Sequence, residues 1–143
     1  MSAKPAQTPS GKPALSGIKV VDLTQFEAGT SITETLAWLG ADVVKIEPPG
    51  GESLRLMAPP GKETSMPVAM LNANKRGITL NLKSDKGKDI LKALVQKADA
   101  LVENYAPGVM DRLGVGFSVL HPINPRMVYA SATGFGLSGP DRD

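Results

Sequence analysis

The sequence contains no cysteine and only one histidine among its 143 residues. The absence of cysteine excludes disulfides, thiolate nucleophiles and thiolate-ligated metal sites. The single histidine, His121, precedes Pro122 and has no acidic cluster at ligand spacing, so we expect no metal centre. The serine, histidine and acidic residues follow no known hydrolase order and form no G-x-S-x-G motif, which argues against triad-based hydrolysis.

Excess charge and long apolar runs are lacking as well. The formal net charge is +2, and Lys4 and Lys12 account for it, so residues 14–143 are neutral overall. This balance gives no support to nucleic-acid binding through a general cationic field. No apolar run approaches the roughly 20 residues that cross a bilayer, so we expect no membrane span and a soluble, cytoplasmic protein.

The composition that is present is ordinary for a globular protein, with 41% hydrophobic and 21% charged residues. A chain of this length is typical of one compact domain or of part of a larger one. Residues 1–14 are rich in Pro, Ser, Lys and Ala and have no apolar run, so they do not match a signal peptide. We expect a disordered leader over residues 1–14 and a single structured unit over residues 15–143.

Strand and helix patterns alternate after the leader. Runs rich in β-branched and apolar residues predict strands over residues 18–23, 42–46, 78–82, 100–103 and 126–132. Amphipathic spacing predicts helices over residues 30–39 and 85–97, and short helical turns over 109–113 and 118–120. This alternation favours an α/β fold with an open, mostly parallel sheet and helices on both faces.

The two longer helices also have predicted ends and core faces. Thr30 or Ser31 can cap the first helix, Gly40 can end it, and Ser84 can cap the second. The residues expected to face the core are Ile32, Leu36 and Leu39 in the first helix and Ile90, Leu91, Leu94 and Val95 in the second.

The segment from Glu47 to about Met66 carries repeated Pro and Gly and predicts a long loop. A loop of this length usually lines a binding site or contacts a partner, and packing against another subunit accounts for its length equally well. In open parallel sheets, ligands bind beyond the carboxyl ends of the strands. We therefore expect a site among the segments that follow Leu23, Ile46, Glu103 and Ala132.

A glycine motif, GFGLSG at residues 134–139, matches G-x-G-x-x-G after a predicted strand. Pro140 follows where the phosphate-binding helix should run, and no ribose-binding acid stands about 20 residues further on. Nicotinamide or flavin binding is therefore a minor alternative, because backbone geometry alone accounts for these glycines.

Five blocks in a fixed order form a more specific pattern. They are LSGIKVVDLTQFEAG (15–29), LGADVVKIEPPGG (39–51), NANKRGITLNLKSDKGKDIL (72–91), ADALVENYAPGVMDRLG (98–114) and NPRMVYASATGFGLSGP (124–140). Together they closely resemble the amino-terminal part of the family III coenzyme A transferases, which include formyl-CoA:oxalate transferases, carnitine CoA-transferases and α-methylacyl-CoA racemases. The resemblance covers nearly everything after the leader.

The resemblance implies a Rossmann-like large domain, of which this chain supplies an incomplete part, in a homodimer whose subunits interlock like rings. It also implies transfer of CoA between an acyl-CoA and a small carboxylic acid, with no tightly bound cofactor. In the transferases an aspartate attacks the thioester, giving a mixed anhydride and then an enzyme-bound CoA thioester. Covalent catalysis of this kind divides one difficult exchange into easier steps.

Matched residue by residue, the family's coenzyme contacts fall on four short segments: Glu27 and Ala28; Leu80, Asn81, Leu82 and Lys83; Asn104, Tyr105 and Ala106; and Arg112. Tyr105 offers a flat surface for adenine stacking, or is a packed core tyrosine. Arg112 suits bidentate contacts with phosphate, or is a surface cation paired with Asp111. Glu27 stands where glutamine is common in formyl-CoA transferases, and Pro48 stands where an arginine is frequent.

Lys75 and Arg76, in the NANKRG signature, have two readings, as neighbours of phosphate or as residues that fix the entry into the next strand. The resemblance places the aspartate nucleophile beyond the GFG block, so we identify no catalytic residue here and expect this portion alone to be inactive. An acyl-CoA racemase of the same family and a non-catalytic CoA-binding module stay open as alternatives.

Overall fold

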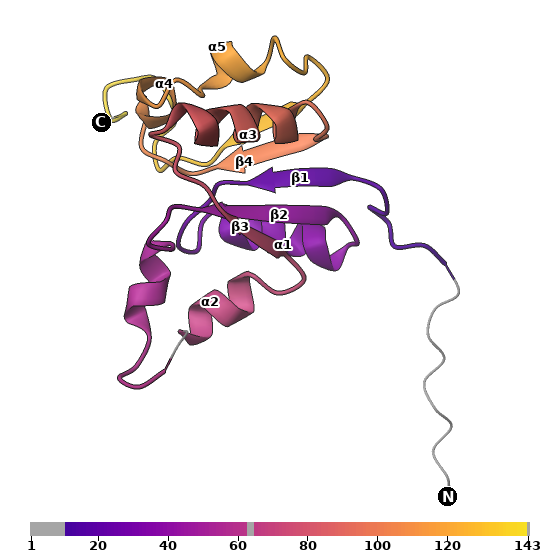
Figure 1. Cartoon of the computed structure of the whole chain (residues 1–143), viewed down its shortest axis with the longest axis vertical. Coiled ribbons are helices and arrows are strands. Elements are labelled where there is room, and N and C mark those ends of the chain that lie inside the picture. Colours follow the sequence, from indigo (N-terminus) through magenta and orange to yellow (C-terminus); the bar gives the residue numbers. More distant parts are fainter. Residues whose placement is uncertain (1–10, 63–64, 143) are drawn as a thin grey trace, which may run out of the picture.

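The computed structural model describes residues 11–62 and 65–142 (Figure 1). Within these residues the chain forms one sheet of five parallel strands: β1 (Lys19–Asp22), β2 (Asp42–Glu47), β3 (Arg76–Thr79), β4 (Ala100–Glu103) and β5 (Val128–Ser131). The strand order is β3-β2-β1-β4-β5, so β1 lies at the centre. The predicted open, parallel α/β sheet is confirmed.

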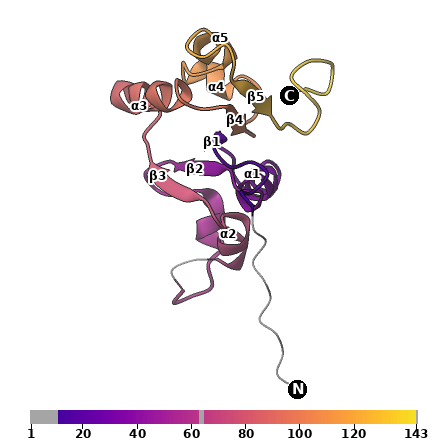
Figure 2. The ribbon, with the colours of Figure 1, turned by 90° about the vertical axis from the view of Figure 1, so that its right-hand side faces the viewer.

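Helices cover both faces of this sheet (Figure 2). One face carries α1 (Thr30–Trp38), and the other carries α3 (Asp85–Val95), α4 (Val109–Arg112) and α5 (Phe117–Leu120). Successive strand residues point to opposite faces, so Val20 packs in the core on the α1 side and Val21 in the core on the α3 side. Among the described residues, no helix is both long and apolar enough to span a bilayer.

The predicted core face of α1 is wrong for two of its three residues. Ile32 and Leu39 are 49% and 45% exposed, and Leu36 is partly buried. The helix residues that are buried instead are Thr30, Thr33 and Ala37. The reason is polar: the Thr33 hydroxyl donates to the buried Asp22 carboxylate at the end of β1, and the Thr30 hydroxyl is hydrogen-bonded to the hydroxyl of Thr24.

The two longer helices begin in different ways. The cap of α3 is Ser84, as predicted, and its Oγ accepts a hydrogen bond from Gly87 N at 3.2 Å. The cap of α1 is Gly29, with φ 77, rather than Thr30 or Ser31. In α3, three of the four residues predicted to face the core do so: Leu91 and Val95 are fully buried, and Leu94 is partly buried. The fourth, Ile90, is 39% exposed.

The segment predicted as a long loop contains regular structure. A 3-10 helix, η1 (Ser53–Met57), interrupts it, and α2 (Met66–Leu71) follows without having been predicted. Ser65 joins the two, because its Oγ donates to Leu54 O at 2.8 Å and accepts from Val68 N at 3.4 Å.

The third strand is displaced from its predicted position. β3 begins at Arg76 and ends at Thr79, two to three residues earlier than the apolar run indicates, so residues 80–82 lie beyond the sheet. All four residues of β3, which forms one edge of the sheet in the described chain, are exposed.

Residues 1–10 of the predicted leader lie outside the described residues. From residue 11 the chain runs beside the end of α1, where Leu15 N donates to Leu39 O at 2.9 Å. Gly40, with φ 97, ends α1 as predicted, and Pro13 occupies the space that a side chain on Gly40 would need. Pro13 therefore packs against the structured unit, and disorder of the leader stays a prediction.

Candidate functional site

Segments that follow four parallel strands meet at the carboxyl edge of the sheet. They enclose a cavity of about 260 Å³, hereafter the first cavity. Its lining comes from Leu23 and Gln25 after β1, residues 46–49 at the end of β2, residues 80–83 after β3, and Tyr105 after β4. The expected carboxyl-edge location of a crevice is thus present, and the predicted contact residues Leu80, Asn81, Leu82, Lys83 and Tyr105 share it.

A second cavity, of about 490 Å³, adjoins the first. It is lined by Ala28 from the β1–α1 loop, residues 104–107 after β4 and residues 132–134 after β5. Tyr105 lines both cavities, so they share one lining residue. The predicted residues Ala28, Asn104 and Ala106 therefore lie next to the segment 80–83 across a single tyrosine.

The segment 80–83 is held close to the start of α3. A Cβ on Gly87 would collide with the carbonyl oxygen of Asn81, so glycine is required for this approach. Asn81 Oδ1 accepts a hydrogen bond from Lys83 N at 3.0 Å, which fixes the turn. Lys83 is exposed and supplies a cation to the first cavity.

Tyr105 combines a partly buried ring with a hydrogen-bonded hydroxyl. Burial raises its pKa, and a hydrogen bond with the Gln25 side chain partly opposes that rise. Its backbone N donates to the buried Glu103 carboxylate at 2.8 Å, which fixes the residue directly after β4. The phenol is therefore neutral at physiological pH and presents an apolar face with one polar tip.

Asn104 fastens the β1–α1 loop to the end of β4. Its Nδ2 donates to Gln25 O and to Ala28 O, both at 2.7 Å, and its Oδ1 accepts from Gln25 N at 2.8 Å. The side-chain amide is thus occupied by the protein's own backbone. Asn104 shapes the wall of the second cavity and presents little free hydrogen-bonding capacity to a ligand.

Two of the predicted contact residues lie away from these cavities. Glu27 is exposed and lines a third cavity, of about 480 Å³, together with Phe26, Glu34 and the α2 residue Met70. Arg112 is exposed on α4, where its Nη1 lies 3.0 Å from the place a Cβ on Gly108 would take. Arg112 does not line the first cavity, although Val109 at the start of the same helix does.

In the NANKRG signature, Lys75 has the contacts of the structural reading, whereas for the exposed Arg76 both readings stay predictions. Lys75 Nζ is buried and donates to Asp22 Oδ2 at 3.0 Å and to Thr33 Oγ1 at 2.8 Å. Burial lowers the pKa of Lys75, and the Asp22 carboxylate opposes that shift. Arg76 pairs with Asp42 on the adjacent strand, with Nη2 and Oδ2 2.7 Å apart. Lys75 thus fixes the entry into β3.

Sequence reasoning missed an ion pair at the end of β2. Glu47, which lines the first cavity, accepts hydrogen bonds from Arg55 Nε and Nη2, both at 2.6 Å. This two-point contact holds the pKa of Glu47 below its usual value, although burial opposes the shift. The sequence did contain a signal for this ion pair: Glu47 ends a strand that is covered on both faces, and a charged residue there needs a partner of opposite charge.

The cavities suit an extended ligand with apolar and polar parts better than a metal ion. Across residues 11–62 and 65–142, no three His, Cys, Asp or Glu side chains are grouped so as to hold one. The walls offer an aromatic face at Tyr105, aliphatic side chains after β3, and the Lys83 ammonium at one edge. Such a lining can bind a molecule that joins a flat ring and an apolar chain to anionic groups.

Comparison with known sequences gives a consistent result. The sequence profile of CoA-transferase family III matches residues 15–143. The chain is 50% identical over 132 residues to a formyl-CoA:oxalate CoA-transferase of Streptomyces avermitilis, covering 91% of this chain and 32% of that protein. A formyl-CoA:oxalate CoA-transferase of Rhodopseudomonas palustris is 47% identical over 133 residues, which is 91% of this chain and 31% of the relative. The chain thus spans about a third of the length of these relatives.

Comparison with solved structures agrees. A CAIB/BAIF family protein from Brucella suis superposes with a TM-score of 0.86 at 37% identity, over 91% of this chain and 36% of that one. A hypothetical protein from Mycobacterium tuberculosis superposes with a TM-score of 0.83 at 37% identity, again over 91% of this chain and 36% of that one.

Proposed function

The chain belongs to CoA-transferase family III, and from this premise we propose that it forms the coenzyme-binding part of an enzyme that moves CoA between an acyl-CoA and a carboxylic acid. The observation that carries the proposal is the meeting of separate predicted contact segments, 80–83 and 104–106, at Tyr105. In sequence these segments are distant, and the parallel topology joins them at one edge of the sheet.

The proposed ligand has three chemical parts, and the site offers a surface for each. The Tyr105 ring can stack against an adenine, the aliphatic wall of residues 80–82 can pack against a pantetheine arm, and Lys83 in the first cavity can bind phosphates. Arg112, which lines neither cavity, can reach only phosphates that extend beyond them. The mismatch lies at Pro48, where the cation frequent in the family is missing. We therefore assign phosphate binding to Lys83, with Arg112 as a further cation outside the two cavities.

The proposed chemistry is stepwise acyl transfer. An aspartate attacks the thioester carbonyl, so that a mixed anhydride forms and CoA thiolate leaves; the thiolate then attacks the enzyme carbonyl and releases the first carboxylate. The acceptor carboxylate attacks the resulting enzyme-CoA thioester, and the thiolate finally takes the new acyl group. We place this aspartate outside the 143 residues, because none of the described aspartates lines the first or second cavity. We also propose an interlinked homodimer that works in the cytoplasm.

Calorimetry on the full-length protein tests the coenzyme site. We expect CoA and acetyl-CoA to bind and NADH not to bind. Replacing Tyr105→Leu removes the stacking surface, worth about 1 kcal/mol, and should weaken CoA binding about fivefold. The matched control is Tyr129→Leu, because Tyr129 is also partly buried but lines neither the first nor the second cavity.

Two outcomes would contradict the proposal. Binding of NADH without binding of CoA would assign the site to a nicotinamide coenzyme. Equal CoA affinities in the two tyrosine variants would place the coenzyme elsewhere. If CoA binds but no carboxylate accepts it, exchange of the hydrogen α to the thioester distinguishes an acyl-CoA racemase from a non-catalytic CoA-binding module.

A further inference from the structure

Four charged side chains are buried beside the β1–α1 loop, and none of them lines the first or second cavity. The side chains of Asp22 and Lys75 are 0% and 1% exposed, and those of Glu52 and Lys45 are 1% and 2% exposed. Two cations and two anions make the group neutral. Buried charges are costly unless they are paired and hydrogen-bonded, and each of these four has such a partner.

The Asp22–Lys75 pair forms hydrogen bonds at both ends of the β1–α1 loop. Asp22 Oδ1 accepts from Thr24 N at 2.9 Å and from Thr24 Oγ1 at 2.6 Å, at the start of the loop. Asp22 Oδ2 accepts from Lys75 Nζ at 3.0 Å and from Thr33 Oγ1 at 2.7 Å. Lys75 Nζ also donates to Thr30 O at 3.0 Å, at the first residue of α1. The ammonium thus ties the helix start to the strand end.

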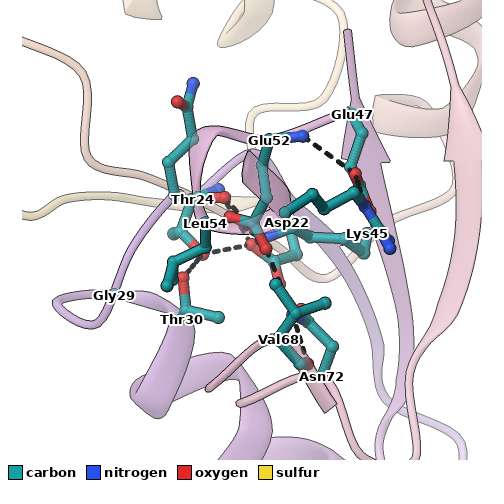
Figure 3. Close-up of polar contacts among 12 residues, drawn as sticks. Asp22, Thr24, Gly29, Thr30, Lys45, Glu47, Glu52, Leu54, Val68 and Asn72 are labelled. Atoms are coloured by element: carbon teal, nitrogen blue, oxygen red, sulfur yellow. Dashed lines mark hydrogen bonds and ion pairs between the residues drawn. The ribbon is translucent and has the colours of Figure 1, made fainter. Parts of the chain in front are cut away.

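The second pair completes a closed series of contacts. Asn72 Oδ1 accepts from Lys75 Nζ at 3.4 Å, and Asn72 Nδ2 donates to Glu52 Oε1 at 3.2 Å. Glu52 Oε2 lies 3.5 Å from Lys45 Nζ, which donates to Thr24 O at 2.5 Å. Figure 3 shows Thr24, Lys45 and Glu52 converging from separate segments. The charge ring consists of Asp22, Thr24, Lys45, Glu52, Asn72 and Lys75.

The β1–α1 loop has a backbone conformation that the surrounding residues must stabilise. Phe26 has φ 56 and Gly29 has φ 77, both in the left-handed region. A phenylalanine adopts that region only where the surrounding structure enforces it. The ring holds Thr24 at both its N–H and its carbonyl, two residues before Phe26. The same loop places Gln25 on the first cavity and Ala28 on the second.

We propose that Lys45 and Lys75 are positioning residues, which act through the charge ring to hold the β1–α1 loop in the form that sets Gln25 and Ala28 on the ligand cavities. Neither lysine lines these cavities, so each acts through the loop. The ring also extends to η1 and α2, because Glu52 is the residue before η1 and Asn72 is the residue after α2. The position of the segment that contains η1 and α2 is therefore coupled to the loop that lines the ligand cavities.

The test separates loop position from stability, and its affinity readout rests on the proposed function. In the full-length protein, Lys75→Met leaves the Asp22 carboxylate buried without its cation, so both stability and CoA affinity should fall. The double variant Asp22→Asn/Lys75→Met removes both charges and should recover most of the stability, because a buried pair can be replaced by neutral groups. The ammonium contacts with Thr30 and Thr33 stay lost, so CoA affinity should stay about tenfold below that of the native protein.

Hydrogen exchange supplies a readout that does not depend on CoA. In the double variant we expect amides of residues 23–29 to exchange about tenfold faster, while those of α3 and β4 return to native rates. Asn72→Leu, which interrupts the ring at an uncharged member, should raise the Kd for CoA about threefold and serves as the second variant. The control Lys97→Met removes an exposed lysine outside the ring and should change neither readout.

Recovery of CoA affinity together with stability in the double variant would overturn the positioning role, and so would native exchange in residues 23–29. Failure of the native protein to bind CoA would refute the proposed function instead, and the exchange measurement would still decide the role of the ring.

Discussion

Charged residues within the sheet show which contacts of a single residue can be predicted from the sequence and which cannot. Lys45 and Glu47 interrupt the apolar run of β2, and their need for partners can be read from the sequence. Their partners, Glu52 and Arg55, lie in the segment rich in Pro and Gly, whose path no periodicity describes. The Ser84 cap, in contrast, depends only on residues within one helical turn and was predictable.

The Glu47–Arg55 pair gives a prediction for pH dependence. Because Arg55 lowers the pKa of Glu47 below 4.5, the pair stabilises the folded state fully above about pH 4.5 and loses its effect as pH falls through the lower folded-state value. Arg55→Met should therefore reduce the free energy of unfolding at pH 7 by about 1 kcal/mol, a modest amount because Arg55 is 41% exposed.

Denaturant unfolding of the full-length protein across pH 3 to 7 measures this effect. The native and Arg55→Met curves should converge toward acidic pH, whereas Arg126→Met, at an exposed position, should follow the native curve throughout. A constant gap between the native and Arg55→Met curves would show that Glu47 titrates without help from Arg55.

At the scale of elements, strands were predicted better than helix faces. The apolar runs of β1, β2 and β4 are buried on both faces of the sheet, so their sequences predict strands without an alternative. The face of α1 was misassigned because a polar group decides it: Asp22 draws Thr33 inward, and Ile32 is turned toward the surface. The six residues of α2 are too short for periodicity to separate a helix from a loop.

Asn104 provides the element-scale prediction, since it fastens the β1–α1 loop to β4. Asn104→Asp replaces the Nδ2 donor with a carboxylate oxygen that faces two carbonyl groups, Gln25 O and Ala28 O. We expect this change to lower the free energy of unfolding by about 1–3 kcal/mol at pH 7. Thermal or denaturant unfolding of the full-length protein measures the change.

Asn81→Asp is the matched control for this substitution. The Asn81 Oδ1 accepts from Lys83 N, a contact that an aspartate retains, so stability should change little. An equal loss of stability in the two variants would mean that the added charge, and not the lost clamp, is responsible.

At the scale of the whole molecule, the location of the site was more predictable than its shape. Parallel topology places every strand end on one edge, so the segments after β1, β3 and β4 had to converge. The role of Tyr105 as a wall shared by two cavities, and the placement of Glu27 on a third, depend on side-chain packing between elements far apart in sequence. Side-chain packing between distant elements cannot be predicted from the pattern of neighbouring residues in the sequence.

The exposed surface gives a prediction for the 143-residue chain by itself. Val128 on the edge strand β5 is 64% exposed, and Phe135 and Leu137 after it are 78% and 57% exposed. An unpaired strand edge beside exposed apolar side chains promotes association. The isolated chain should therefore self-associate in light-scattering measurements and show no CoA transfer from any acyl-CoA to a carboxylate. Measurable turnover would contradict the placement of the nucleophile outside these residues.

The strand order also has a consequence for synthesis on the ribosome. β1 is made first, yet one of its two neighbours, β4, does not exist until Ala100 has been translated. At roughly 5–20 residues per second, the nascent β1–β2 pair waits several seconds with an open hydrogen-bonding edge. The central strand is therefore open to mispairing during translation until β4 has been made.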